Sequence, residues 1–209
     1  MKQADVRRVQ VKSLGVKYLS ALWLAWALVL VSKPAVAAGL DQPPWVLQSR
    51  RAASDFAASL RTRLQAGLKQ GPVAAIEVCH REAPQIALDV GARHGLSVRR
   101  TSVRVRNAAN APSAADEALL AVMAARLLAG EPASDIEIIE DRGSAGKRLA
   151  KPLVMEAVCL MCHGETLGPE VSAAIALRYP DDQATGFRLG ELRGALLVES
   201  VIVESVIKE

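Results

Sequence analysis

The residues with the clearest chemistry stand close together in the last quarter of the chain, in the order Cys159-Leu160-Met161-Cys162-His163. On a helix, residues three and four apart share a face, so both thiols and the imidazole can contact one planar group. Two thiols can add to the two vinyl groups of a haem while the next imidazole binds its iron, which is why C-x-x-C-H is a c-type haem attachment signal. The motif predicts one covalent haem c, held by Cys159 and Cys162, with His163 as an iron ligand.

Other chemistries also use cysteines at this spacing. A disulfide between Cys159 and Cys162 in a thioredoxin-like site would need a βαβ context, which the surrounding pattern lacks. A zinc ion could take Cys79, Cys159, Cys162 and His163 as a Cys₃His set, although the adjacent Cys162 and His163 are poorly arranged for one tetrahedral site. We favour haem and keep the disulfide, the zinc site and a purely structural cysteine pair as alternatives.

The third cysteine, Cys79, lies among apolar residues at helical spacing. The residues that could complete the iron coordination opposite His163 are Cys79, His80, His94, Met123 and Met155. The methionines have apolar neighbours, as core methionines do, and both histidines stand beside charged residues, which is typical of a solvated position. From the residues alone, Cys79 is either the second ligand or a small buried apolar side chain.

The N-terminal residues predict export. Basic residues precede an apolar run from Tyr18 to Val31, and Ala35-Val36-Ala37 follows, so residues 1–37 have the three regions of a secretory signal peptide. The run has 14 residues, fewer than the roughly 20 that span a bilayer as a helix. Because Lys33 stands near the cleavage site, an uncleaved anchor is the alternative. In either case we expect a periplasmic protein with no membrane span after the leader.

The composition excludes several classes of protein. The 209 residues are 51% hydrophobic and 23% charged, which excludes a long disordered chain and permits one sizeable core. Residues 1–37 hold six of the 26 basic residues and one of the 22 acidic ones, which leaves 20 basic and 21 acidic residues beyond the leader. We therefore expect no nucleic-acid partner. Beyond the leader the only aromatic residues are Trp45, Phe56, Tyr179 and Phe187, which leaves room in the core for an apolar cofactor.

The hydrophobic pattern predicts an α+β fold after a linker at residues 38–44: one antiparallel sheet with helices packed on one side. We expect a long helix over 45–69 and a second helix that begins at Pro72 and is kinked by Pro84. A helix capped by Ser113 follows, and two further helices cover 158–163 and 169–177. The expected strands are 97–105, 135–141, 148–154 and one after Gly194, with a hairpin turn at Gly143–Gly146.

A set of short motifs carries a resemblance to a known family. In chain order they are Cys79 with Ala83-Pro84, Arg100-Thr101-Ser102, Arg106-Asn107 with Asn110 and Pro112, Lys151-Pro152, Cys159-Leu160-Met161-Cys162-His163-Gly164, Tyr179-Pro180-Asp181-Asp182, Gly186-Phe187, Gly190 and Arg193-Gly194. Over residues 45–200 the chain resembles the PAS-like one-haem c-type domain, the "Tll-like" haem domain. The resemblance implies a PAS-like α+β fold with one covalent haem, and it implies Cys79 as the unusual second axial ligand.

Members of that family occur alone or as exported sensor parts of signalling proteins. The resemblance therefore favours a redox or small-ligand sensor, and a soluble periplasmic electron carrier is the alternative; the partner would be a redox or signalling protein. We find no nucleophile elbow, phosphate loop, HExxH or paired carboxylates and expect no enzyme. Arg100, Arg104 and Arg106 are candidate contacts for the haem propionates, or a solvated strand face. Val198–Ile202 is repeated at once as Val203–Ile207, so residues 201–209 are interpreted as a tail extension without function.

Overall fold

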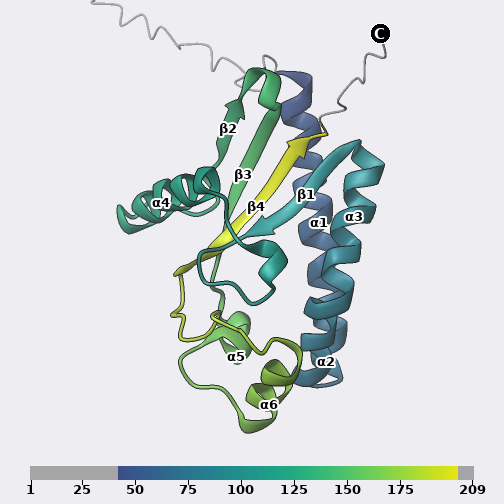
Figure 1. Cartoon of the computed structure of the whole chain (residues 1–209), viewed down its shortest axis with the longest axis vertical. Coiled ribbons are helices and arrows are strands. Elements are labelled where there is room, and N and C mark those ends of the chain that lie inside the picture. Colours follow the sequence, from purple (N-terminus) through teal and green to yellow (C-terminus); the bar gives the residue numbers. More distant parts are fainter. Residues whose placement is uncertain (1–41, 202–209) are drawn as a thin grey trace, which may run out of the picture. The chain divides into compact units, whose positions relative to one another are not determined.

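The computed structural model describes residues 42–201. The predicted leader, most of the linker and nearly all of the tail extension lie outside these residues. The fold is α+β and PAS-like, as predicted, with one antiparallel sheet in the order β1-β4-β3-β2 (Figure 1). The strands are Leu96–Thr101 (β1), Ile138–Asp141 (β2), Lys147–Val154 (β3) and Leu192–Ser200 (β4). No helix within the described range is long and apolar enough to cross a membrane.

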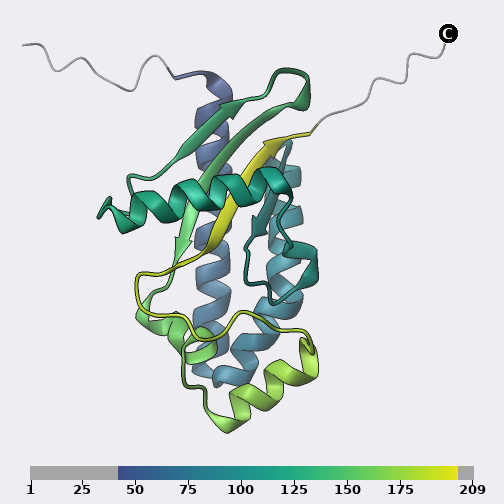
Figure 2. The same ribbon diagram turned by 60° about the vertical axis from the view of Figure 1, so that its left-hand side comes forward.

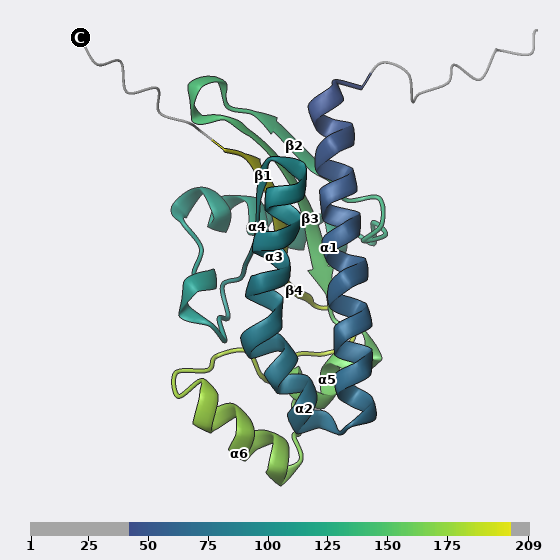
Figure 3. The ribbon, with the colours of Figure 1, turned by 90° about the vertical axis from the view of Figure 1, so that its right-hand side faces the viewer.

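The helices α1 (Pro44–Lys69), α2 (Pro72–Glu77) and α3 (Ala83–His94) form one layer beside the sheet (Figure 3). Gly71 separates α1 from α2 with a φ of 114°, and Pro72 then occupies the first turn of α2. Both the long N-terminal helix and the break at Gly71-Pro72 agree with the sequence pattern. The lower half of α1 extends past the end of the sheet, so its apolar side reaches the region where the site lies.

The expected kink at Pro84 takes the form of a π-helical segment, Val78–Glu82, between α2 and α3. Pro84 has no N–H to donate to residue 80, and its ring would clash with the carbonyl of that residue in a regular α-helix. The widened turn relieves this conflict, and the N–H of Ala83 donates to the carbonyl of Val78, five residues back. Cys79 lies inside this segment, and π-helical turns are frequent at functional sites.

Helices cover both faces of the sheet, so the expectation that they pack on one side was wrong. Along β4, Leu196 and Val198 join the core formed with α1 and α3, while Ala195 and Leu197 join a second core with α4 (Ala114–Leu128). Figure 2 shows α4 crossing the face opposite to α1. Successive strand residues point to opposite faces, and β4 is apolar over the consecutive positions Ala195–Val198, so this central strand needs cover on both faces.

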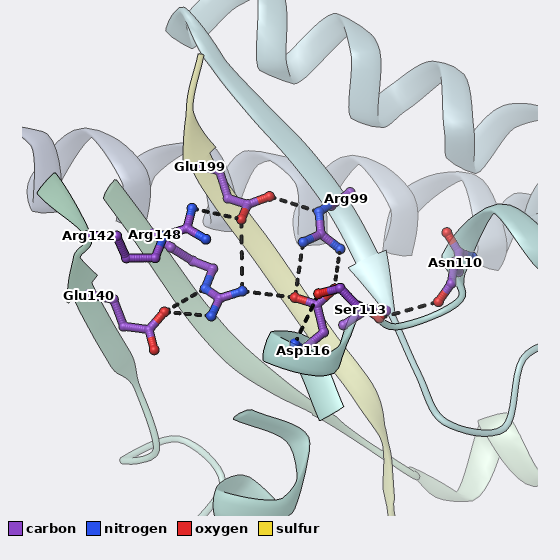
Figure 4. A network of polar contacts seen from close by, with 9 residues as sticks. Arg99, Asn110, Ser113, Asp116, Glu140, Arg142, Arg148 and Glu199 are labelled. Carbon is purple, nitrogen blue, oxygen red and sulfur yellow. Dashed lines mark hydrogen bonds and ion pairs between the residues drawn. The ribbon is translucent and has the colours of Figure 1, made fainter. Parts of the chain in front are cut away.

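The start of α4 is tied to the second face of the sheet by buried charges. The predicted cap is confirmed: Ser113 Oγ accepts from the N–H of Asp116, and the Ser113 N–H donates to Asp116 Oδ2. Asp116 is also bonded by two arginines, Arg148 at 2.8 Å and Arg99 at 3.1 Å. Arg99, Arg142 and Arg148 alternate with Asp116, Glu140 and Glu199 across the strands (Figure 4). The network is neutral in sum and links the start of α4 to all four strands, through Arg99, Glu140, Arg148 and Glu199.

The strand β1 is shorter than the expected 97–105 because the chain leaves the sheet after Thr101. Ser102 Oγ donates to the carbonyl of Arg193 at 2.6 Å, and the Ser102 N–H donates to the carbonyl of Asn110. These bonds divert residues 102–110 into a loop. The hairpin at Gly143–Gly146 is present between β2 and β3 as a short 3₁₀ turn.

The strands β1 and β4 lie so close at Gly194 that a larger residue there should destabilise the fold. A Cβ atom on Gly194 would lie 2.3 Å from the carbonyl oxygen of Thr101, which is backbone and cannot turn away. We expect Gly194→Ala to lower the free energy of unfolding by about 3 kcal/mol, the upper end for an overpacked interior, as measured by urea denaturation. Gly168→Ala is the control, because nothing lies within 4 Å of its Cβ position and only a helix-cap preference is lost. Equal stabilities of the two variants would contradict the prediction.

Candidate functional site

A cavity of about 570 Å³ lies beyond the end of the sheet, enclosed by the lower half of α1, by α2 and the π-helical segment, and by the chain that follows β3. Figure 1 shows these elements around α5 (Leu160–His163). The walls are mainly apolar and include Phe56, Leu60, Leu64, Leu68, Ile76, Leu153, Val154 and Leu196. Size and lining are those of a site for an apolar small molecule or cofactor.

Four side chains predicted from the sequence line this cavity: Cys79, Cys159, Cys162 and His163. Cys159 closes a short 3₁₀ turn (Ala157–Cys159), and Cys162 and His163 follow in α5. The local geometry therefore agrees with the helix expected over 158–163. All three cysteines are free thiols, and burial raises the pKa of Cys162.

His163 is held so that one ring nitrogen remains available. Its Nδ1 lies 2.6 Å from the carbonyl oxygen of Ala184, and because a carbonyl only accepts, Nδ1 carries the proton. Burial, assisted by the charges of Arg106 and Arg193, lowers the pKa of His163 to about 3. The ring is neutral at physiological pH. Its Nε2 carries no proton, so the lone pair of this nitrogen can bind a metal ion.

The backbone around His163 is fixed by the segment that precedes β4. The Phe187 N–H donates to the carbonyl of His163, and the Gly186 N–H donates to the carbonyl of Gly164. The Phe187 ring packs edge-on against the imidazole with 6.3 Å between centroids. A Cβ on Gly164 would lie 2.5 Å from the carbonyl oxygen of Leu160, so the turn after the histidine requires glycine.

Cys79 lines the cavity from the π-helical segment, whereas His163 lines it from α5, in the chain that follows β3. Burial raises the pKa of its thiol, and Arg100, Arg106 and Arg193 oppose that rise. Of the other candidate ligands, His94 pairs with Asp55 and Met123 lies in the core beneath α4. His80 packs edge-on against Tyr179. Met155 lines the cavity but packs with Ala184 and Phe187, the two residues that contact His163.

The three predicted arginines have different surroundings. Arg106 makes a bidentate pair with Asp182, and its Nη2 also donates to the carbonyls of Cys162 (2.7 Å) and Ala184 (3.1 Å). Arg106 therefore fixes the backbone of the cysteine motif and the acceptor of His163. It also lines the cavity.

Arg104 does not line the cavity, so the structure does not bring it together with the other site residues. Its guanidinium lies 3.7 Å from the centroid of the Phe187 ring and pairs with Glu191. Arg100 does line the cavity. The strand ends at Thr101, and residues 104 and 106 belong to the following loop, which is why the three side chains do not form one strand face.

Sequence reasoning assigned no role to Asp182, Ala184, Phe187 and Arg193 at this site. The Oδ1 atom of Asp182 accepts from the Ala184 N–H, and the same carboxylate binds Arg106. Three of these residues stand in motifs that carry the family resemblance, which was the available signal. Ala184 acts through its backbone carbonyl oxygen. Every residue type has this atom, so the sequence could not single out Ala184.

Of the alternatives for the cysteines, neither the disulfide nor the zinc site gains support. Cys159 and Cys162 are not bonded to each other. Within residues 42–201, no three His, Cys, Asp or Glu side chains lie close enough together to hold a metal ion directly. A zinc site would need such a tetrahedral group.

Comparisons with known proteins show a family and a similar fold. The family model described as Tll0287-like (Tll0287) matches residues 44–200. A solved structure described as the crystal structure of the cyanobacterial heme-protein Tll0287 is similar in fold, with a TM-score of 0.54 and 22% sequence identity over 78% of this chain and 98% of that one. None of the curated proteins compared with the chain is a significant match.

Proposed function

This chain belongs to the Tll0287-like family, and we propose that it is an exported monohaem c-type cytochrome that acts as a redox or small-ligand sensor. The protein to which its fold is similar is described as a heme-protein, which supports haem as the group bound here. The N-terminal 37 residues, with the pattern of a secretory leader, support a periplasmic location. The proposed role is binding and electron exchange, without catalysis, and its partner is a redox or signalling protein.

The observation that carries the proposal is the meeting of Cys79 with Cys159, Cys162 and His163 on one apolar cavity. Cys159 and Cys162 would hold the haem by thioether bonds, and His163 Nε2 would bind the iron, with the Ala184 carbonyl fixing the ring orientation. When bound, haem supplies one-electron chemistry. The apolar walls exclude water from the site.

Cys79 is the proposed second axial ligand. Although burial raises the pKa of its free thiol, coordination to a cationic metal deprotonates a thiol. A thiolate favours ferric over ferrous iron, so Cys79 would bind the group most strongly in its oxidised form. Because Cys79 lies in the π-helical segment Val78–Glu82, gain or loss of this ligand would act directly on the segment between α2 and α3. That linkage favours a sensor over an electron carrier, whose ligands would stay the same in both redox states.

Covalent attachment is tested by extraction. The full chain, produced with c-type haem maturation machinery, should retain its haem through acid–acetone treatment. The Cys159→Ala/Cys162→Ala double variant should lose essentially all of it, because no thioether can form. Cys79→Ala is the matched control, since it removes a cavity thiol outside the attachment motif and should leave covalent haem in place. Release of free haem from the wild-type chain would refute the proposal.

A further inference from the structure

A second, smaller hollow of about 110 Å³ adjoins the cavity at the end of β1. It shares Arg100, Arg106, Arg193, Leu153 and His163 with the main cavity, whereas neither Cys159 nor Cys162 lines it. The rest of its lining comes from Thr101, Ser102, Val105, Asn110 and Gly194. Its volume is a few times the ~30 Å³ share of one water molecule. This is room for carboxylate groups and not for a macrocycle.

The charges around the two hollows do not balance. Arg106 is matched by Asp182, and Arg61 at the cavity mouth is matched by Glu156 at 3.7 Å. Arg193 donates only to neutral oxygens, Ser102 Oγ at 2.8 Å and the carbonyl of Arg104 at 3.1 Å. Within the described residues, Arg100 makes no side-chain hydrogen bond or ion pair, and its Cζ lies 5.9 Å from the centroid of the Phe56 ring. Two positive charges are left without a carboxylate.

Both of these arginines are partly buried. Burial lowers the pKa of Arg100, and burial together with the neighbouring Arg106 and Arg100 lowers the pKa of Arg193 to about 10. A buried cation without a counter-charge is costly, and the cost is relieved by an anionic partner. Guanidiniums are well matched to carboxylates because their N–H groups form paired, parallel hydrogen bonds.

We propose that this hollow is a dicarboxylate site in which Arg193 and Arg100 bind the two haem propionates. The proposal rests on the proposed function, and it assigns Arg193 a binding role in place of the sequence-predicted Arg104. The two propionates of haem leave the macrocycle at the edge opposite to its vinyl groups. That agrees with the linings of the two hollows: Cys159 and Cys162 line only the main cavity, whereas His163 and the arginines line both.

Charge at this site should set the redox equilibrium of the iron. Removing a cation leaves a propionate uncompensated, and the added negative potential favours the ferric form. In the matured full chain we expect Arg193→Gln and Arg100→Gln each to raise the ferric-to-ferrous ratio at a fixed potential at least tenfold, which for one electron lowers the midpoint potential by about 59 mV. Arg104→Gln is the control and should leave the midpoint potential nearly unchanged, because its charge is paired with Glu191.

The measurement is spectroelectrochemistry in phosphate-free buffer, with covalent haem quantified separately by the pyridine haemochrome spectrum. If haem is attached but both glutamine variants keep the wild-type potential, the propionate assignment is wrong while the proposed function stands. If the wild-type potential depends on added phosphate and Arg193→Gln abolishes that dependence, a free oxyanion occupies the hollow and the assignment is again wrong. Arg193→Lys keeps the charge, so its midpoint potential should return most of the way to the wild-type value. If Arg193→Gln does not fold, Arg193→Lys and Arg100→Gln still decide the test.

Discussion

Replacing Cys79 with serine should abolish the low-spin thiolate signal of the ferric protein in electron paramagnetic resonance and raise its midpoint potential. The reason is loss of the anionic sulfur donor that favours ferric iron. Axial ligands set haem potentials over a range of about 0.8 V, so we expect a rise on the order of 100 mV or more. Covalent haem should stay at the wild-type level, since Cys159 and Cys162 are intact.

His80→Ala is the matched control for this variant. His80 neighbours Cys79 in the same π-helical segment but packs against Tyr179 and does not line the cavity. Its removal should leave the ferric spectrum unchanged. A wild-type spectrum in Cys79→Ser would eliminate Cys79 as the ligand. An identical ligand set before and after reduction of the wild type would favour the electron carrier over the sensor.

The second large effect is expected at Asp116, which is 1% exposed and faces Arg148 at 3% exposure. Asp116→Asn removes the charge that both Arg99 and Arg148 bind and weakens the cap of α4. Breaking a buried ion pair on one side costs about 3–5 kcal/mol. We expect a loss of about 3 kcal/mol in the free energy of unfolding, because Arg148 keeps Glu140. Glu117→Gln, at the exposed next position of α4, should change stability by less than about 0.5 kcal/mol.

The stabilities of the wild type and of Asp116→Asn should also respond differently to acid. Burial alone would raise the pKa of Asp116, but hydrogen bonds from Arg99 and Ser113 outweigh it and hold that pKa below its ordinary value. A lowered native pKa contributes stability that is present above the unfolded pKa, about 3.9, and is lost as pH falls through the native value. The stability difference between wild type and Asp116→Asn should therefore shrink below about pH 4, as followed by urea denaturation at several pH values. A constant difference would refute this account.

Much of the fold could be predicted because its signals are local. The helix 45–69 is visible as a 3.6-residue period, and Ser113 with Asp116 forms a cap within four residues. The break at Gly71-Pro72 and the disturbance at Pro84 depend on the backbone chemistry of single residues. The packing of helices was predicted less well, because β4 is apolar at consecutive positions and such a run does not say which helix covers which face.

The candidate site also combines residues that are close in sequence with residues that only the fold brings together. The order and spacing of Cys159, Cys162 and His163 are enough to predict that they serve one bound group, because one turn of chain brings them to one face. Cys79 enters the cavity from a separate helix layer, and Arg193 reaches the small hollow from β4, far along the chain from Arg100 on β1.

Sequence by itself therefore determined the attachment motif, the capped and broken helices and the α+β class. Only the tertiary structure decided that Arg106 pairs with Asp182 and that Arg104 lies outside the cavity. It also decided that Arg100 and Arg193 form no ion pair with any carboxylate of residues 42–201. The physical reason is that the ion pairing and the burial of a side chain depend on the residues that surround it in space. Arginines at 100, 104, 106 and 193 have the same side-chain chemistry, and packing alone determines which counter-charges and how much water each one meets.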